Sequence, residues 1–177
     1  MKHFPDSAPA GGHVRGGLRM RLALFQPDIP QNLGAAIRLC ACLGPILEII
    51  GPCAFPLSEK SLKRAALDYG EEAELQVHAS WSAFLESPGR EDGRLVLFTT
   101  RAASSYVDFE FESGDTLMFG RESAGVPEDV HAAATARLLI PMRPGLRSLN
   151  VVTAAAMALG EALRQTRGFA GLGSKTL

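Results

Sequence analysis

The strongest constraint on the fold of this chain is a repeated rhythm, in which a short β-rich apolar run is followed by a loop and a segment of helical spacing. The predicted strands are 22–26, 47–50, 75–78, 95–99, 116–119 and 138–140. Several of them are continuously apolar, which is typical of strands buried on both faces of a parallel sheet. The alternation of strands and helices therefore predicts an α/β fold built on a parallel sheet.

The predicted helices are 33–43, 59–68, 81–85, 127–134 and 149–165. Their ends rest on capping residues. Gly44 is expected to end the first helix, and Ser58 and Ser80 to begin the second and third. Asn32 is placed to cap the first helix, and Ser148 to cap the last.

Length and composition indicate one globular domain. A chain of 177 residues has the length of one domain, and 46% apolar with 21% charged residues suffices for a core. We expect the domain at 20–167, between a Gly- and Pro-rich flexible leader at 1–19 and a flexible tail at 168–177. The leader is an over-long start, a cloning remnant or an RNA-touching arm. No apolar run reaches the roughly 20 residues of a membrane span, so no membrane contact is expected.

Charge and cysteine content favour a cytoplasmic protein with a local binding patch. Eighteen Lys and Arg against 19 Asp and Glu give a net charge of −1, which excludes unselective coating of nucleic acid. The cysteines, Cys40, Cys42 and Cys53, have neither zinc-site spacing nor an even count for disulfides. We expect Cys40 and Cys42 to be buried, inert thiols. The histidines lack metal-ligand spacing, so no metal is expected.

Three loops after predicted strands carry residues that a plain connector does not need. Because ligands of open α/β sheets bind at the carboxyl ends of strands, these loops predict one common site. The first, 27–38, contains Asn32, Gly34 and Arg38. Arg38 is either a surface residue whose stem lies along the helix, or a binder of phosphate or carboxylate.

The second loop, 117–127, has Gly120 and Gly125 on either side of a charged pair. Close approach of a ligand and a tight strand-to-helix turn both fit that pattern. The loop lacks the patterns of nucleotide-binding loops and of the serine hydrolase elbow, so Ser123 is expected to be a turn residue.

The third loop, 140–150, leads into the last helix. It places Arg143 and Arg147 beside the positive N-terminal end of that helix. These arginines form an anion-binding patch or are simply solvated.

The three loops become specific when they are considered in order. They read Asn32-x-Gly34-x-x-x-Arg38, Phe119-Gly120-x-Glu122-x-x-Gly125, and Ile140-Pro141-Met142 followed by Ser148-Leu149-Asn150-Val151. They resemble the motifs of the SPOUT class of RNA methyltransferases, in the branch that methylates ribose 2′-hydroxyls. The stretches 24–34 and 62–69 are similar to its minimal members, which act on the tRNA wobble nucleotide. The likeness covers 20–167.

The resemblance implies a parallel-sheet SPOUT fold with a C-terminal trefoil knot, and a homodimer. It also implies S-adenosylmethionine as the cofactor, held by residues of the three loops and of the fourth predicted strand. By this likeness the cofactor-binding residues are Phe98, Thr99, Gly120, Ile140, Met142, Ser148 and Leu149.

The resemblance further implies a polar shell around the site of methyl transfer, formed by Asn32, Glu122, Ser148 and Asn150. Arg38 would help to activate the ribose hydroxyl. Because a guanidinium holds its proton tightly, we expect Arg38 to orient the phosphate and stabilise developing charge. The backbone of the tRNA anticodon loop would be bound by Arg121, Arg143 and Arg147.

The predicted activity is 2′-O-methylation of cytidine or a modified uridine at the tRNA wobble position. Methylation of another RNA such as ribosomal RNA, a non-catalytic RNA-binding homodimer of the same fold, and a flavodoxin-like small-molecule enzyme are the alternatives. Gly160 stands where the wobble enzymes have tyrosine, and Arg121 and Ala124 also depart from their pattern. These departures concern the choice of target more than the chemistry.

Overall fold

The computed structural model describes residues 19–57, 69, 72–88, 90, 93–170 and 172–173. Within them, one sheet contains β1 (Arg21–Phe25), β2 (Ile46–Ile50), β3 (Leu75–His78), β4 (Leu95–Phe98), β5 (Ser104–Ser105), β6 (Thr116–Phe119) and β7 (Ala136–Leu139). The strand order is β3-β2-β1-β6-β4-β7-β5, and neighbouring strands run parallel. The predicted parallel α/β fold is confirmed.

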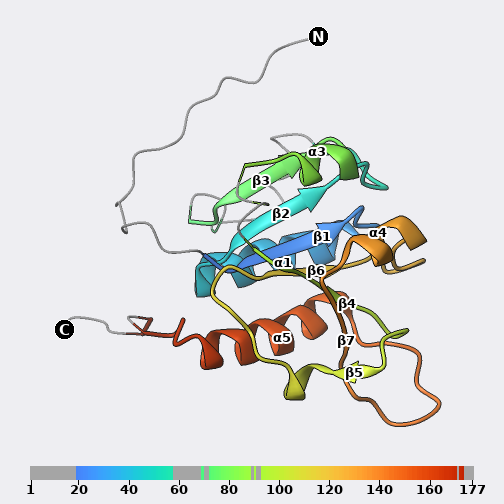
Figure 1. Cartoon of the computed structure of the whole chain (residues 1–177). Coiled ribbons are helices and arrows are strands. Elements are labelled where there is room, and N and C mark those ends of the chain that lie inside the picture. Colours follow the sequence, from blue (N-terminus) through green and yellow to red (C-terminus); the bar gives the residue numbers. More distant parts are fainter. Residues whose placement is uncertain are drawn as a thin grey trace.

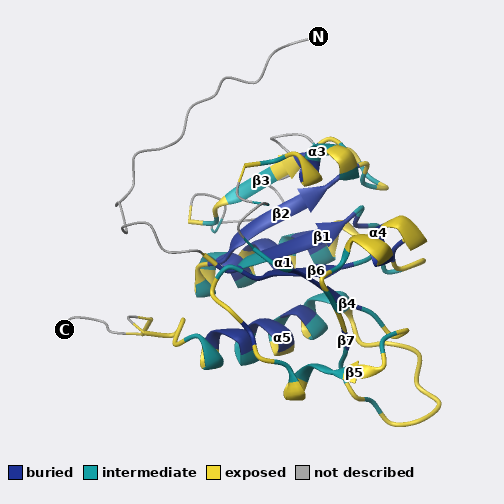
Figure 2. Ribbon diagram, viewed as in Figure 1, coloured by how far each residue is buried: buried dark blue, intermediate teal, exposed yellow. Residues whose placement is uncertain are grey.

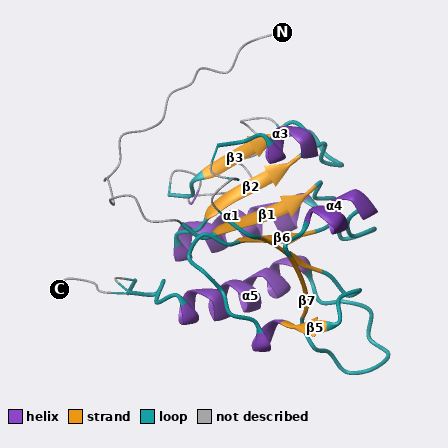
Figure 3. Cartoon of the chain, in the orientation of Figure 1, coloured by secondary structure: helices purple, strands orange, loops and turns teal. Residues whose placement is uncertain are grey.

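Helices cover both faces of the sheet (Figures 1 and 3). They are α1 (Pro30–Leu43), α3 (Trp81–Leu85), α4 (Glu128–Ala133) and α5 (Val151–Gln165). Successive strand side chains alternate between the faces, so Leu22 and Leu24 pack with α1 and α5, while Ala23 and Phe25 pack with α3 and α4. The central strands β1, β2, β4 and β6 of this three-layer structure are accordingly buried, whereas β3, β5 and β7 are partly exposed (Figure 2).

Predicted strand ends agree with the observed ends to within one or two residues, because apolar runs stop where the strands leave the core. Two short elements were not predicted, β5 and the 3-10 helix η2 (Tyr106–Asp108). Neither has an apolar pattern of its own. The predicted helix at 59–68 and leader residues 1–18 lie outside the described residues.

Two capping predictions are confirmed and two are wrong. Gly44 ends α1 in the left-handed conformation, and the Ser80 hydroxyl accepts a hydrogen bond from the Ala83 N–H. Asn32 does not cap α1, which begins two residues earlier at Pro30, whose ring favours helical φ. Asn150, not Ser148, caps α5.

One of the two burial predictions for cysteines is also wrong. Cys40 is buried, whereas Cys42, two positions along α1, is exposed. Burial raises the pKa of the Cys40 thiol to about 12.

A charged cluster interrupts the apolar α3 and α4 face of the sheet. The Glu48 carboxylate, 1% exposed, accepts hydrogen bonds from Arg21 on β1 and from His78 Nε2 at 2.5 Å on β3. Burial by itself would raise the pKa of Glu48, but the hydrogen bonds from His78 and Arg21 outweigh it and lower the pKa. The carboxylate therefore joins three neighbouring strands.

Segment 109–115 crosses α5 on its way to β6 (Figure 1). Gln165, at the end of α5, forms two hydrogen bonds with the backbone of this segment. Its Oε1 accepts from the Phe111 N–H at 2.9 Å, and its Nε2 donates to the Phe109 carbonyl at 3.0 Å. The crossing segment is thus tied to the end of α5. The knot itself stays a prediction.

Replacing Gly160 by alanine is expected to stabilise the protein by about 0.5–1 kcal/mol. Gly160 lies inside α5 with an ordinary helical φ, and a Cβ added there meets nothing within 4 Å. Alanine would restrict the unfolded chain without a clash. Urea unfolding of both proteins measures the difference, and a lower midpoint for the variant would show that another molecule packs against this position.

Candidate active site

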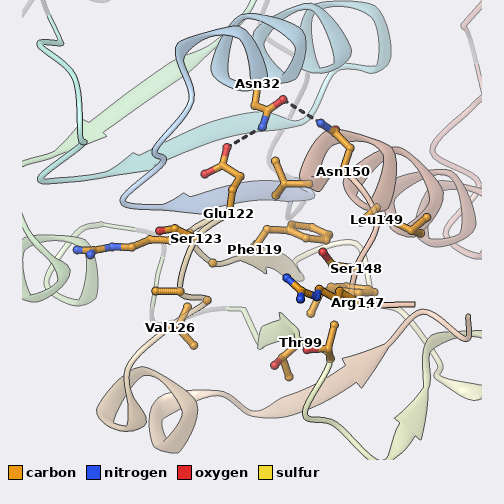
Figure 4. Close-up of a pocket in the computed structure, with 18 of the residues that line it drawn as sticks. Asn32, Thr99, Phe119, Glu122, Ser123, Val126, Arg147, Ser148, Leu149 and Asn150 are labelled. Atoms are coloured by element: carbon orange, nitrogen blue, oxygen red, sulfur yellow. Dashed lines mark hydrogen bonds between the residues drawn. The ribbon is translucent and has the colours of Figure 1, made fainter. Parts of the chain in front are cut away.

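A cavity of about 630 Å³ opens at the carboxyl ends of β1, β4, β6 and β7 (Figure 4). All three loops singled out in the sequence contribute to its wall, and so does the end of β4. The lining residues that had been predicted for the site are Asn32, Phe98, Thr99, Gly120, Arg121, Glu122, Ile140, Met142, Arg147, Ser148, Leu149 and Asn150. Its size is within the range of small-molecule sites.

A chain of hydrogen bonds joins one residue from each loop (Figure 4). Asn32 Nδ2 donates to Glu122 Oε1 at 2.8 Å, and Asn150 Nδ2 donates to Asn32 Oδ1 at 3.0 Å. Asn150 Oδ1 in turn accepts from the N–H groups of Val152 and Thr153 at the start of α5. Because the Glu122 carboxylate only accepts, it determines which way the Asn32 amide points, and Asn32 then determines the orientation of Asn150.

The second loop is a tight turn closed on itself. Arg121 and Gly125 exchange two backbone hydrogen bonds, each of 2.9 Å, and Gly125 has a φ of 66°. Gly120 lies so close to this turn that a Cβ there would be 2.5 Å from the Gly125 carbonyl carbon. Both glycines are therefore required by backbone geometry.

The cavity floor is aromatic and apolar. The rings of Phe98 and Phe119 stack with centroids 4.9 Å apart and an interplanar angle of 12°. Both side chains are buried, and Tyr106 contacts the Phe98 ring edge-on. With the asparagines, Glu122 and Arg147 around the rim, the cavity suits a flat apolar group that carries charged substituents.

Asn150→Ala is expected to lower the free energy of unfolding by about 1 kcal/mol, the usual value of a lost N-cap. Asn150→Asp is the matched variant, because its carboxylate still caps α5 but cannot donate to Asn32. Stability should therefore drop in the alanine variant only, while both variants lose the hydrogen bond to Asn32. Denaturant unfolding measures the first effect, and equal stability losses in the two variants would contradict it.

Two predicted site residues do not line this cavity. Arg38 lies six positions beyond Asn32 on α1, is exposed, and holds its guanidinium 4.5 Å from the centroid of the Tyr69 ring. Arg143 is exposed in the third loop, on the other side of Gly145, whose φ is 86°. Arg38 therefore does not belong to the hydrogen-bonded group of Asn32, Glu122 and Asn150 in its own protomer.

Asp28, which supports the wall of the site from outside the cavity, was not singled out in the sequence. Asp28 does not line the cavity, but its N–H donates to Glu122 Oε2 at 2.9 Å, and its Oδ2 accepts from the Ser123 N–H at 3.0 Å and hydroxyl at 2.5 Å. The hydrogen bond from the Ser123 hydroxyl is the main cause that lowers the pKa of Asp28. The sequence signal that could have indicated Asp28 is its position in the first loop, four residues before Asn32. Ser123 lies in a turn as predicted.

The part of the chain that is described contains no group of three or more His, Cys, Asp and Glu side chains able to hold a metal ion. Nor, over the same residues, is any helix long and apolar enough to cross a membrane.

Comparison with known proteins agrees with this geometry. The model of the SpoU rRNA Methylase family matches residues 19–160. The tRNA (cytidine(34)-2'-O)-methyltransferase of Beijerinckia indica subsp. indica is 56% identical over 144 residues, which are 81% of this chain and 90% of that protein.

Two solved structures are similar as well. One, described as "Structural insights into the 2-OH methylation of C/U34 on tRNA", superposes with a TM-score of 0.76 at 44% identity, over 84% of this chain and 97% of the other. The second is the SpoU methyltransferase AviRb from Streptomyces viridochromogenes in complex with the cofactor AdoMet, with a TM-score of 0.74 and 25% identity over 86% and 62% of the two chains.

The parallel sheet with a loop-built cavity at its carboxyl edge is the fold of the SPOUT methyltransferases. Because the family model spans most of the chain and the relatives cover more than two thirds of it, the chain belongs to the SpoU rRNA methylase family.

Proposed function

We propose that this protein is an S-adenosylmethionine-dependent methyltransferase that modifies the ribose 2′-hydroxyl of the wobble nucleotide, cytidine or a modified uridine, in tRNA. The single observation that carries the proposal is the cavity in which all three motif loops meet. It is supported by the 56% identity to a protein named for methylation of cytidine 34. The protein would act on this tRNA in the cytoplasm.

The lining of the cavity fits this cofactor. Its apolar part, which contains Ile140, Met142, Leu149 and the stacked phenylalanines, suits adenine and ribose. Glu122 offers a negative charge to the positively charged groups of the molecule. When bound, the cofactor supplies a methyl group on a sulfonium, which is transferred to an oxygen approaching in line with the departing sulfur.

The protein contributes mainly orientation and charge. Asn32, Glu122, Ser148 and Asn150 form the polar rim where the ribose would be placed, and their mutual hydrogen bonds hold the rim in one arrangement. A fixed arrangement of reacting groups supplies much of the rate in such a transfer. The exposed Arg143, with Arg121 and Arg147, would bind phosphates of the anticodon loop.

The position of Arg38 supports a homodimer. Arg38 does not line the cavity of its own protomer, and the third loop and α5 expose apolar side chains at Leu146 and Met157. In the proposed dimer a second copy covers these side chains and brings Arg38 to the substrate bound at the partner's cavity. Sedimentation should show a dimer at micromolar concentration, and a stable monomer would contradict it.

The decisive experiment is incubation of the purified protein with tritiated S-adenosylmethionine and with total tRNA from a strain that lacks this protein. Nuclease digestion then identifies the labelled nucleoside. Label in 2′-O-methylcytidine or a 2′-O-methyluridine derivative at position 34 is expected. Label in ribosomal RNA would retain the chemistry with another substrate, and cofactor binding without label in any RNA would favour a binding protein.

A further inference from the structure

Two loops that lie 95 residues apart in sequence exchange hydrogen bonds beside the cavity. The loop after β1 donates the Asp28 N–H to Glu122, and the turn after β6 donates the Ser123 N–H and hydroxyl to the Asp28 carboxylate. Each loop thus satisfies polar groups of the other. Asp28 itself does not line the cavity.

The bonds inside the turn determine its shape but not its place. The two backbone bonds between Arg121 and Gly125 close the turn on itself, and would do so wherever it lay. Its position relative to β1 depends on contacts that leave the turn. The hydrogen bonds seen between it and the β1 to α1 segment are those of Asn32 and Asp28.

The Asp28 contact is of the strong kind. Both Ser123 donors converge on one oxygen, Oδ2, of a carboxylate whose negative charge is also favoured by the Arg121 guanidinium. Hydrogen bonds to an ionised acceptor are shorter and stronger than neutral ones. The neighbouring bond from Asn32 to Glu122 orients a side chain, whereas the Asp28 contact holds the backbone of the turn.

We propose that Asp28 is a positioning residue for cofactor binding, which acts through Ser123 by fastening the 120–125 turn in the place where it forms one wall of the cavity. Residues 120–126 all line the cavity, so a shift of this turn changes its width along that whole side. The inference rests on the proposed function in one respect, namely that this cavity receives S-adenosylmethionine.

Asp28→Ala tests the proposal, because it removes the acceptor and keeps the backbone N–H that binds Glu122. In the free protein the Ser123 amide hydrogen should exchange about tenfold faster, as expected when a hydrogen bond to a charged group is lost. The Kd and KM for S-adenosylmethionine should rise by about the same factor. kcat at saturating cofactor, KM for tRNA and Tm should stay near wild type, which a general structural defect would not allow.

Asp28→Asn is the conservative variant, since its carbonyl can still accept from the Ser123 N–H, and it should recover part of the cofactor affinity. Asp108→Ala, at an exposed carboxylate outside the cavity, is the matched control and should change none of these values. A wild-type exchange rate for the Ser123 amide in Asp28→Ala, or faster exchange with an unchanged cofactor Kd, would overturn the proposal. A wild-type protein that bound no S-adenosylmethionine would instead overturn the proposed function, and faster exchange in the variant would still support the tether.

Discussion

Arg38→Ala is expected to lower the rate constant of methyl transfer about 100- to 1,000-fold, the usual cost of losing one group that stabilises developing charge. The ribose hydroxyl is a weak nucleophile, and its oxygen gains negative charge as its proton leaves. A guanidinium next to it stabilises that charge and orients the adjacent phosphate. In the structure Arg38 is exposed on α1 and is held over the Tyr69 ring, free to contact RNA.

Cofactor binding separates this role from a structural one. Because Arg38 does not line the cavity, the Kd for S-adenosylmethionine should be unchanged in Arg38→Ala, as measured by calorimetry. Single-turnover transfer to tRNA gives the rate. Arg137→Ala, at an exposed arginine that hydrogen-bonds the His131 carbonyl, is the matched control and should transfer methyl groups normally. Equal rates for Arg38→Ala and wild type would refute the role, and no transfer by either protein would favour a binding module.

Glu48→Ala is expected to cost about 3–5 kcal/mol of unfolding free energy, the usual effect of removing one partner of a buried ion pair. The carboxylate is 1% exposed and accepts hydrogen bonds from Arg21 and His78. Without it Arg21 and His78 lose the carboxylate to which both donate. Urea unfolding measures the loss.

Two further variants make this result interpretable. Glu74→Ala removes the exposed partner of Arg19 and should cost no more than about 1 kcal/mol, as for other surface pairs. Glu48→Gln keeps the shape and one acceptor oxygen, and should lie between wild type and Glu48→Ala. A cost below 1 kcal/mol for Glu48→Ala would show that solvent reaches the cluster.

The same cluster predicts a pH dependence. The pKa of Glu48 is lower in the folded protein than its ordinary value of 4.5. The unfolded chain therefore binds the proton more readily, and the stability that Glu48 contributes is present above pH 4.5 and is lost as the pH falls through the folded pKa. When the pH is lowered from 6 through the folded pKa of Glu48, the wild-type protein should lose more unfolding free energy than Glu48→Gln. Parallel pH curves for the two would contradict this.

Much of the fold follows from local patterns in the sequence. Apolar runs such as 95–98 and 116–119 are strands because their alternating side chains are buried on both faces of the sheet. Gly44 ends α1 because glycine adopts positive φ without a steric cost. The motif loops follow the strands, so their convergence at one sheet edge could also be predicted. These features depend on interactions within a few residues, or on the general rule for parallel sheets.

Tertiary structure alone decided which side chains meet inside that edge. Asn32 bonds residues 90 and 118 positions away, and Asp28 bonds one 95 positions away, once β6 has been inserted between β1 and β4. Asn32 is engaged with these partners rather than with the start of α1, which begins at Pro30, and Asn150 rather than Ser148 caps α5. Arg38 belongs to the same motif as Asn32, yet the helical turn directs it to another face. Spacing along a chain specifies which residues share an element, whereas the path of the crossover connections determines which elements bring their side chains together.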